Sequence, residues 1–218
     1  MKKILTIVTA ILFASAAAHA EKRIGISGAF TSLSTEGTET TKSSNEKNTG
    51  SKDEDVVVPS VFIEVAPQGT LAFGLDIVPG EAELGSGTGS NDDAETSGAN
   101  KASAELSGHV TAYLLIPVRE TFYVKTGIAR ASVDTTETLA TGTKYGDQTV
   151  NGFLIGVGVS RDMSNGMFMR AEATHTDYED VSLQGSLNGN AAGDSAVRNK
   201  IDADVDATAF RISIGKAF

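Results

Sequence analysis

Three side chains with catalytic chemistry stand at alternate positions of one largely apolar stretch, namely Glu105, Ser107 and His109. A serine, a histidine and a carboxylate are the parts of an activated nucleophile. On a β-strand, however, residues two positions apart stand about 7 Å from each other, which is too far for the hydrogen bond that activates a serine. The other histidine of the mature chain, His175, has no evident serine partner. We therefore predict that the protein is not an enzyme and that it holds no cofactor and no metal at a catalytic centre.

Charged residues also interrupt apolar strands at positions that share a face with small and polar side chains. The four acidic and three basic members of this set are Glu64, Asp76, Glu105, Glu172, Lys125, Arg170 and Arg211. Buried charges need partners, because an unpaired charge in a low-dielectric interior is costly. The near balance of the two signs predicts a network of ion pairs, provided that the strands close into a ring.

Apolar residues recur at every second position in eight segments, as a half-buried strand requires. In the segment that begins at Arg23, for example, Ile24, Ile26 and Phe30 share one face. The predicted strands are 23–32, 56–65, 71–78, 103–116, 122–133, 149–160, 167–177 and 205–218.

The connections between these strands alternate strictly between long and short. The long ones cover residues 33–55, 79–102, 134–148 and 178–204, and the short ones cover 66–70, 117–121 and 161–166. Outer-membrane barrels sort their connections in this way, with tight turns toward the periplasm and long loops outside. The long loops are acidic and rich in Gly, Ser and Thr, which favours a solvated, partly disordered surface. Binding of a divalent cation or of an extracellular partner there is left open.

Composition excludes several classes of protein. The 218 residues include no cysteine and carry a formal net charge of -10, which argues against a disulfide scaffold and against nucleic-acid binding. Residues 1–20 have two lysines, an apolar run and the sequence Ala18-His19-Ala20, the pattern of a secretory signal peptide that is cleaved after Ala20. Beyond it no apolar run approaches the roughly 18 residues of a spanning helix. Residues 21–218 are expected to form one barrel domain.

The last strand supplies a further cue, because Phe210, Ile212 and Ile214 share the parity of the final residue, Phe218. This pattern resembles the terminal signal that the barrel-assembly machinery recognises in bacterial outer-membrane barrels, although Lys216 departs from it. Segments such as 123–130, 156–159 and 169–172 look like those of the small barrels related to the OmpA transmembrane domain and the opacity-type surface proteins. The resemblance implies an all-β fold, an eight-stranded antiparallel up-and-down transmembrane barrel, with salt bridges in its lumen.

The sequence therefore predicts a protein of the bacterial outer membrane with a structural or surface-interaction, adhesin-like role. Its expected partners are outer-membrane lipids and lipopolysaccharide, the barrel-assembly machinery and an unknown extracellular molecule, and not nucleic acid. Three alternatives stay open, namely a narrow gated ion channel, a lipid A-modifying barrel enzyme and a soluble periplasmic ligand-binding barrel. The last exists because alternation is unchanged when the inner and outer faces are exchanged.

Overall fold

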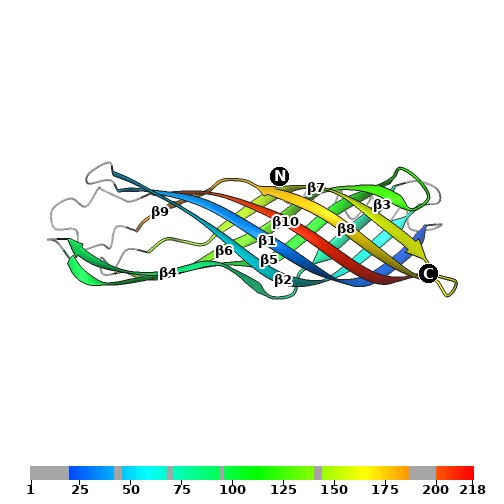
Figure 1. The fold of residues 1–218 in the computed structure, drawn as a ribbon, viewed down its shortest axis with the longest axis horizontal. Helices are drawn as coiled ribbons and strands as arrows, with labels where there is room; N and C mark the ends of the chain where they lie inside the picture. Colours follow the sequence, from blue (N-terminus) through cyan, green and yellow to red (C-terminus); the bar gives the residue numbers. More distant parts are fainter. Residues whose placement is uncertain (1–19, 42–45, 68–70, 94–95, 140–143, 187–199) are drawn as a thin grey trace.

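The computed structural model describes residues 20–41, 46–67, 71–93, 96–139, 144–186 and 200–218. Nearly all of these residues lie in ten antiparallel strands that wind around one axis (Figure 1). The strands are β1 (Glu21–Thr41), β2 (Glu46–Ala66), β3 (Ala72–Ile77), β4 (Glu81–Asp93), β5 (Thr96–Pro117), β6 (Phe122–Thr138), β7 (Gln148–Asp162), β8 (Met167–Tyr178), β9 (Val181–Gln184) and β10 (Lys200–Ala217). The predicted signal peptide lies outside the described residues, apart from Ala20.

A closed ring forms because the first and last strands pair with each other. The ring order is β1, β2, β3, β5, β6, β7, β8 and β10, and Ile26 of β1 stands opposite Ile214 of β10. β4 continues the line of β3 after a break at Val78–Gly80, and β9 continues that of β8. The predicted eight-stranded antiparallel barrel is confirmed. Among the described residues, no helix is long and apolar enough to cross a membrane.

The predicted long loops are wrong over much of their length, because the strands continue through them. β1 and β2 pair as far as Thr41 and Glu46, so residues 33–41 and 46–55 form a β-ribbon. The acidic residues at 53–55, 92–93, 202, 204 and 206 lie on strands. We call this end of the barrel the ribbon end. The opposite end, which carries the short connections and the C-terminus, is the turn end (Figure 1).

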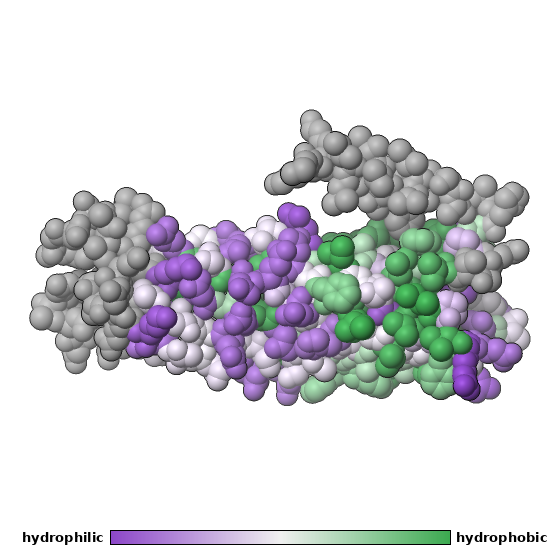
Figure 2. All heavy atoms as spheres, turned by 90° about the horizontal axis from the view of Figure 1, so that it is seen from above, coloured by the Kyte–Doolittle hydropathy of each residue, from purple (hydrophilic) through white to green (hydrophobic). Residues whose placement is uncertain are grey.

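An apolar belt surrounds the half of the barrel nearer the turn end. The large apolar side chains there point outward and are about half exposed, for example Ile26 (60%), Ile155 (52%) and Ile212 (52%). Figure 2 shows the hydrophobic surface gathered in this half, with polar surface toward the ribbon end. The belt is the reverse of a water-soluble barrel, in which apolar side chains fill the interior, and it matches the lipid-facing band of a transmembrane barrel.

Large rings fill the lumen at the level of the belt because small residues face them. Phe62, whose parity is that of Glu64, packs over Gly25, and Phe168 packs over Gly215. A Cβ atom at Gly215 would stand 2.3 Å from the Phe168 ring. The glycines that accompany the apolar residues in these strands therefore make space for side chains from neighbouring strands.

Candidate functional site

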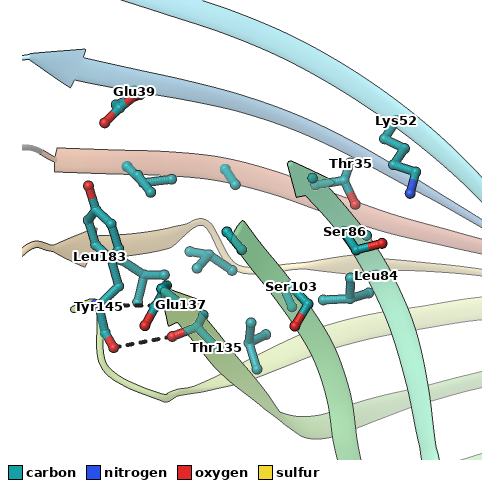
Figure 3. Close-up of a pocket in the computed structure, with 18 of the residues that line it drawn as sticks. Thr35, Glu39, Lys52, Leu84, Ser86, Ser103, Thr135, Glu137, Tyr145 and Leu183 are labelled. Atoms are coloured by element: carbon teal, nitrogen blue, oxygen red, sulfur yellow. Dashed lines mark hydrogen bonds between the residues drawn. The ribbon is translucent and has the colours of Figure 1, made fainter. Parts of the chain in front are cut away.

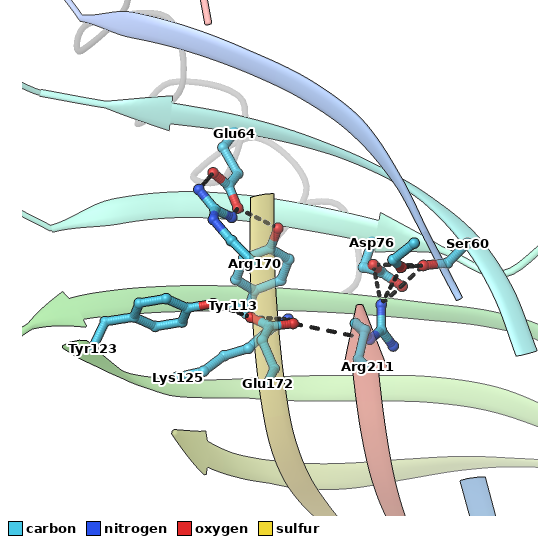
Figure 4. Close-up of polar contacts among 10 residues, drawn as sticks. Ser60, Glu64, Asp76, Tyr113, Tyr123, Lys125, Arg170, Glu172 and Arg211 are labelled. Carbon is cyan, nitrogen blue, oxygen red and sulfur yellow. Dashed lines mark hydrogen bonds and ion pairs between the residues drawn. The ribbon is translucent and has the colours of Figure 1, made fainter. Parts of the chain in front are cut away.

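Three ion pairs cross the lumen inside the belt, each joining two strands (Figure 4). Alternation places their members on the inner face of the strands, where the closing of the ring brings them together. Arg170 donates to Glu64 (Nη2 to Oε2, 2.8 Å), Lys125 donates to Glu172 (Nζ to Oε2, 3.0 Å), and Arg211 donates to Asp76 (Nη1 to Oδ2, 2.5 Å). Five of these six residues are at most 4% exposed, the exception being Arg211.

Neutral groups add further hydrogen bonds to these charges. The Tyr113 hydroxyl donates to Glu64 at 2.7 Å, and the Tyr123 hydroxyl donates to Glu172 at 2.9 Å. The Lys125 ammonium also lies 4.2 Å from the centre of the Tyr113 ring, which adds a cation–π attraction. Such hydrogen bonds offset the desolvation of paired buried charges. We call these six charged residues and two tyrosines the lumen network.

Glu105, the seventh charged residue of the predicted set, does not join the network. The β5–β6 register shifts between Ser107 and Val110, where Gly108 adopts a φ of +59°. This bulge exchanges the two faces of β5, so that Leu106 is buried and Glu105 is exposed on the outer wall. The predicted lumen position of Glu105 is therefore wrong, and the network contains three acidic and three basic residues.

The serine and histidine of the same stretch have separate partners. Ser107 donates to Asp134, and His109 Nε2 lies 2.9 Å from the Tyr178 hydroxyl. His175 contacts Thr208 through Nδ1 at 3.0 Å. In the part of the chain that the structure describes, no group of three or more His, Asp or Glu side chains is arranged to hold a metal ion.

Above the lumen network, toward the ribbon end, the interior becomes apolar. Its buried cluster consists of Leu33, Leu84, Leu106, Ala129, Ala131, Val133, Val150, Tyr178, Val181, Val205 and Ala207. This cluster was not predicted: Leu33, Leu84, Tyr178 and Val181 lie where we expected polar loops, and the other seven members lie near the ends of predicted strands. Leu33, Val133 and Val205 have the parity of inward residues in their own strands, which is the signal that could have found it.

A cavity of about 670 Å³, the ribbon-end cavity, continues upward from the apolar cluster (Figure 3). Leu84, Val133 and Val205 form part of its wall. Polar side chains, among them Glu39, Glu137 and Tyr145, line the part of the cavity near the C-terminal ends of β1 and β6. Its size is that of a typical small-molecule pocket, and apolar walls with a few polar groups are the usual lining of such pockets.

A second cavity of about 360 Å³, the side cavity, reaches from the interior to the barrel wall. His109, Tyr178 and Arg211 line its inner part, whereas Val57 and Pro59 belong to the wall. It lies where the wall is incomplete: β2 pairs with β3 only over Val61–Val65, and β4 pairs with β5 but not with β2. Pro59 suits such an unpaired edge because it has no N–H to donate.

A third cavity, of about 550 Å³, opens at the turn end and is lined by Arg170 and Tyr123 among others. The lumen network therefore lies between this cavity and the side cavity. Glu64, Lys125 and Glu172 line neither of them, and their side chains occupy the lumen between the two spaces (Figure 4).

The arrangement is similar to that of solved outer-membrane proteins. The outer membrane protein OprG of Pseudomonas aeruginosa superposes with a TM-score of 0.58 at 15% identity, over 92% of this chain and 97% of that one. The chain has the fold of an outer-membrane β-barrel. The outer membrane protein AlkL gives 0.54 at 10% identity (92% and 90% covered), and the outer membrane protease OmpT of Escherichia coli gives 0.56 at 8% (92% and 98%). No protein-family model and no curated protein matches the chain.

Proposed function

We propose that this barrel lies in the outer membrane, with its ribbon end outside the cell, and binds a small amphiphilic molecule in the ribbon-end cavity. The observation that carries the proposal is the change of the interior from charged to apolar above the belt. An inward apolar wall around about 670 Å³ of space is not needed to close a barrel, since the lumen of an eight-stranded barrel is filled by side chains. It provides a site for an alkyl chain.

The lumen network determines where such a ligand can go. The ion pairs and the two tyrosines are hydrogen-bonded across the lumen, so an apolar molecule would have to break these bonds to pass toward the turn end. The side cavity offers the other direction, because it joins interior residues to the unpaired edge of β2 at the level of Val57. We infer that the ligand exchanges with the outer leaflet through this edge.

The proposal makes the molecule a binding protein and not an enzyme. Ser107 and His109 donate to or contact different partners, Asp134 and Tyr178, so they do not act on one another. The protease OmpT shares 8% identity with the chain, which supports a common fold alone. The proposed binding role differs from the structural or surface-interaction, adhesin-like role predicted from the sequence, in which the partner is an extracellular molecule bound at the surface.

A narrow gated channel is the second candidate, and one contact favours it. The Arg211 guanidinium pairs with Asp76 while its Nε stands 4.0 Å from Glu172 Oε2. An arginine within reach of two carboxylates could exchange between them and open a path. In planar bilayers, Arg211→Met and Lys125→Met would then show conductance that the wild-type barrel lacks.

Photo-crosslinking tests the binding site directly. An alkyl diazirine is incubated with the barrel in nanodiscs, and labelled positions are mapped by mass spectrometry. Labels on the outer belt arise from the bilayer and serve as the internal reference. We expect additional labels on inward residues such as Val133 and Val205, competed away by unlabelled amphiphile. Labels confined to the belt would refute the proposal.

A further inference from the structure

One side of the ribbon-end cavity carries two carboxylates and an aromatic ring. Glu39 comes from β1, Glu137 comes from β6, and Tyr145 precedes β7 (Figure 3). The Tyr145 N–H donates to Glu137 Oε1 at 3.2 Å, and the Thr135 hydroxyl donates to the Tyr145 carbonyl at 3.2 Å. These contacts fix the backbone of Tyr145 against β6, so that the ring stands beside the carboxylates.

We call this side of the cavity, with Glu39, Glu137 and Tyr145, the rim, and its net charge is negative. Burial and the neighbouring carboxylates of Glu39 and Glu137 raise the pKa of the Tyr145 hydroxyl to about 12, so the group stays neutral at physiological pH. Lys52 lies on the opposite side of the cavity (Figure 3) and forms an ion pair with Glu54 at 2.5 Å. Its charge is therefore already matched by a carboxylate that does not line the cavity.

The remainder of the ribbon end also carries a negative net charge. Carboxylates outnumber lysines along the strands beyond the belt, as in the segments 53–55 and 202–206. A cleft lined by one sign of charge raises the local concentration of oppositely charged ligands. The apolar wall below, with Leu84, Val133 and Val205, accepts no charge of its own.

We propose that the ribbon-end cavity selects amphiphiles whose head group is cationic, such as an alkylammonium, with the head beside Glu39, Glu137 and Tyr145. The tail then lies against the apolar wall. A tyrosine face attracts quaternary ammonium groups through its quadrupole, and the two carboxylates add Coulombic attraction. This inference rests on the proposed function, since it names the ligand class of the same cavity.

Three probes with one tail separate the two proposals. Hexyltrimethylammonium, hexyl sulfate and hexyl glucoside are titrated calorimetrically into the full barrel in nanodiscs of digalactosyldiacylglycerol, which is neutral and has no amine. Heats from empty nanodiscs are subtracted. Because partly exposed ion pairs contribute modestly, we expect the cationic probe to bind about five to ten times more tightly than the anionic one.

Matched variants locate the effect. Glu39→Gln/Glu137→Gln should bring the three affinities to within about twofold of each other. The control Glu105→Gln/Glu179→Gln removes the same charge from exposed positions that do not line the cavity and should keep at least half of the preference. Ala104→Phe places a ring in the cavity wall and should abolish binding of all three probes.

Each outcome has one meaning. If no probe binds above empty nanodiscs, the cavity is not a binding site and the proposed function fails. If all three bind alike and Ala104→Phe blocks them, the proposed function stands and the selection for cations is overturned. If the control double variant loses the preference as fully as Glu39→Gln/Glu137→Gln, the general field of the ribbon end and not this rim selects the ligand, and the inference is again overturned.

Discussion

Replacing Arg170 by methionine should remove a large part of the stability of the barrel. The guanidinium donates to Glu64 from both Nη atoms and lies 4.4 Å from the centre of the Phe168 ring. Its loss leaves the Glu64 carboxylate, 2% exposed, with the Tyr113 hydroxyl as its remaining hydrogen-bond donor among the described residues. Removing one partner of a buried ion pair costs about 3–5 kcal/mol, because an uncompensated charge stays behind.

Urea unfolding in lipid vesicles, followed by the heat-dependent gel mobility of the folded barrel, measures this cost. With an m-value of about 2 kcal/mol per M, a loss of that size lowers the unfolding midpoint by about 2 M. Arg130→Met makes the same chemical change at an exposed position of β6 and should shift the free energy of unfolding by less than about 0.5 kcal/mol.

The double variant Arg170→Met/Glu64→Gln decides whether the charge is the cause. Glutamine keeps the size of Glu64 and an acceptor for Tyr113 but carries no charge, so the double variant should recover at least about 2 kcal/mol of the loss. If the two substitutions are additive, or if Arg170→Met alone costs less than about 1 kcal/mol, the lumen pair is not a coupled buried pair and the description of the network is wrong.

Three further outcomes are expected. Gly158→Val drives a side chain into the lumen ring that faces it, at 2.4 Å for the Cβ alone, and should cost about 1–3 kcal/mol in the same urea assay, whereas Gly28→Ala, with no atom within 4 Å, should change stability little. The Asp180 carboxyl, through a hydrogen bond and its charge, raises the pKa of Asp204, so the folded ribbon binds the proton more tightly. Order there is favoured at low pH and is lost as pH rises through the raised pKa. Hydrogen exchange of β9 and β10, corrected for intrinsic rates, should therefore be slower at pH 4 than at pH 7 in the wild type but not in Asp204→Asn. Phe218→Ala removes a ring from a residue that is 72% exposed and keeps its backbone hydrogen bonds with Lys22. It should slow assembly by the barrel machinery in a reconstituted insertion assay while leaving the urea midpoint unchanged, and equal insertion rates would contradict the predicted terminal signal.

Hydrophobic alternation predicts the strands only where one face meets lipid. Between Phe30 and Ile24 the pattern is strong, and β1 has the predicted faces. Beyond the belt both faces of the ribbon are largely polar, and the pairing of β1 with β2 up to Thr41 is carried by ladder hydrogen bonds that leave no apolar period in the sequence. The ends of the predicted strands therefore coincide with the edge of the belt and not with the ends of the ladders.

The members of the lumen network could be assigned to the lumen from parity, but not their pairing. Parity predicts that Glu64 and Arg170 face inward. Their contact depends in addition on the strand registers, which place Glu64 opposite Arg23 on β1 and Arg170 opposite Ser213 on β10. The prediction for Glu105 failed because the bulge between Ser107 and Val110 gives the residues before it the opposite parity to those after it. Gly108, a glycine inside a predicted strand, was the available sign of that bulge.

The two halves of the barrel use the same parity for opposite purposes. Along β6, the inward positions carry Lys125 within the belt and Val133 beyond it, while the outward positions change from Ile128 to Asp134. Within the belt, contact with lipid favours apolar side chains on the outer face, and the ion pairs fill the lumen. Beyond the belt, contact with water favours polar side chains on the outer face. The inward residues beyond the belt face neither lipid nor the water outside the barrel. That Leu84, Val133 and Val205 are apolar and form part of the wall of a cavity is the feature for which ligand binding supplies a reason and barrel closure does not.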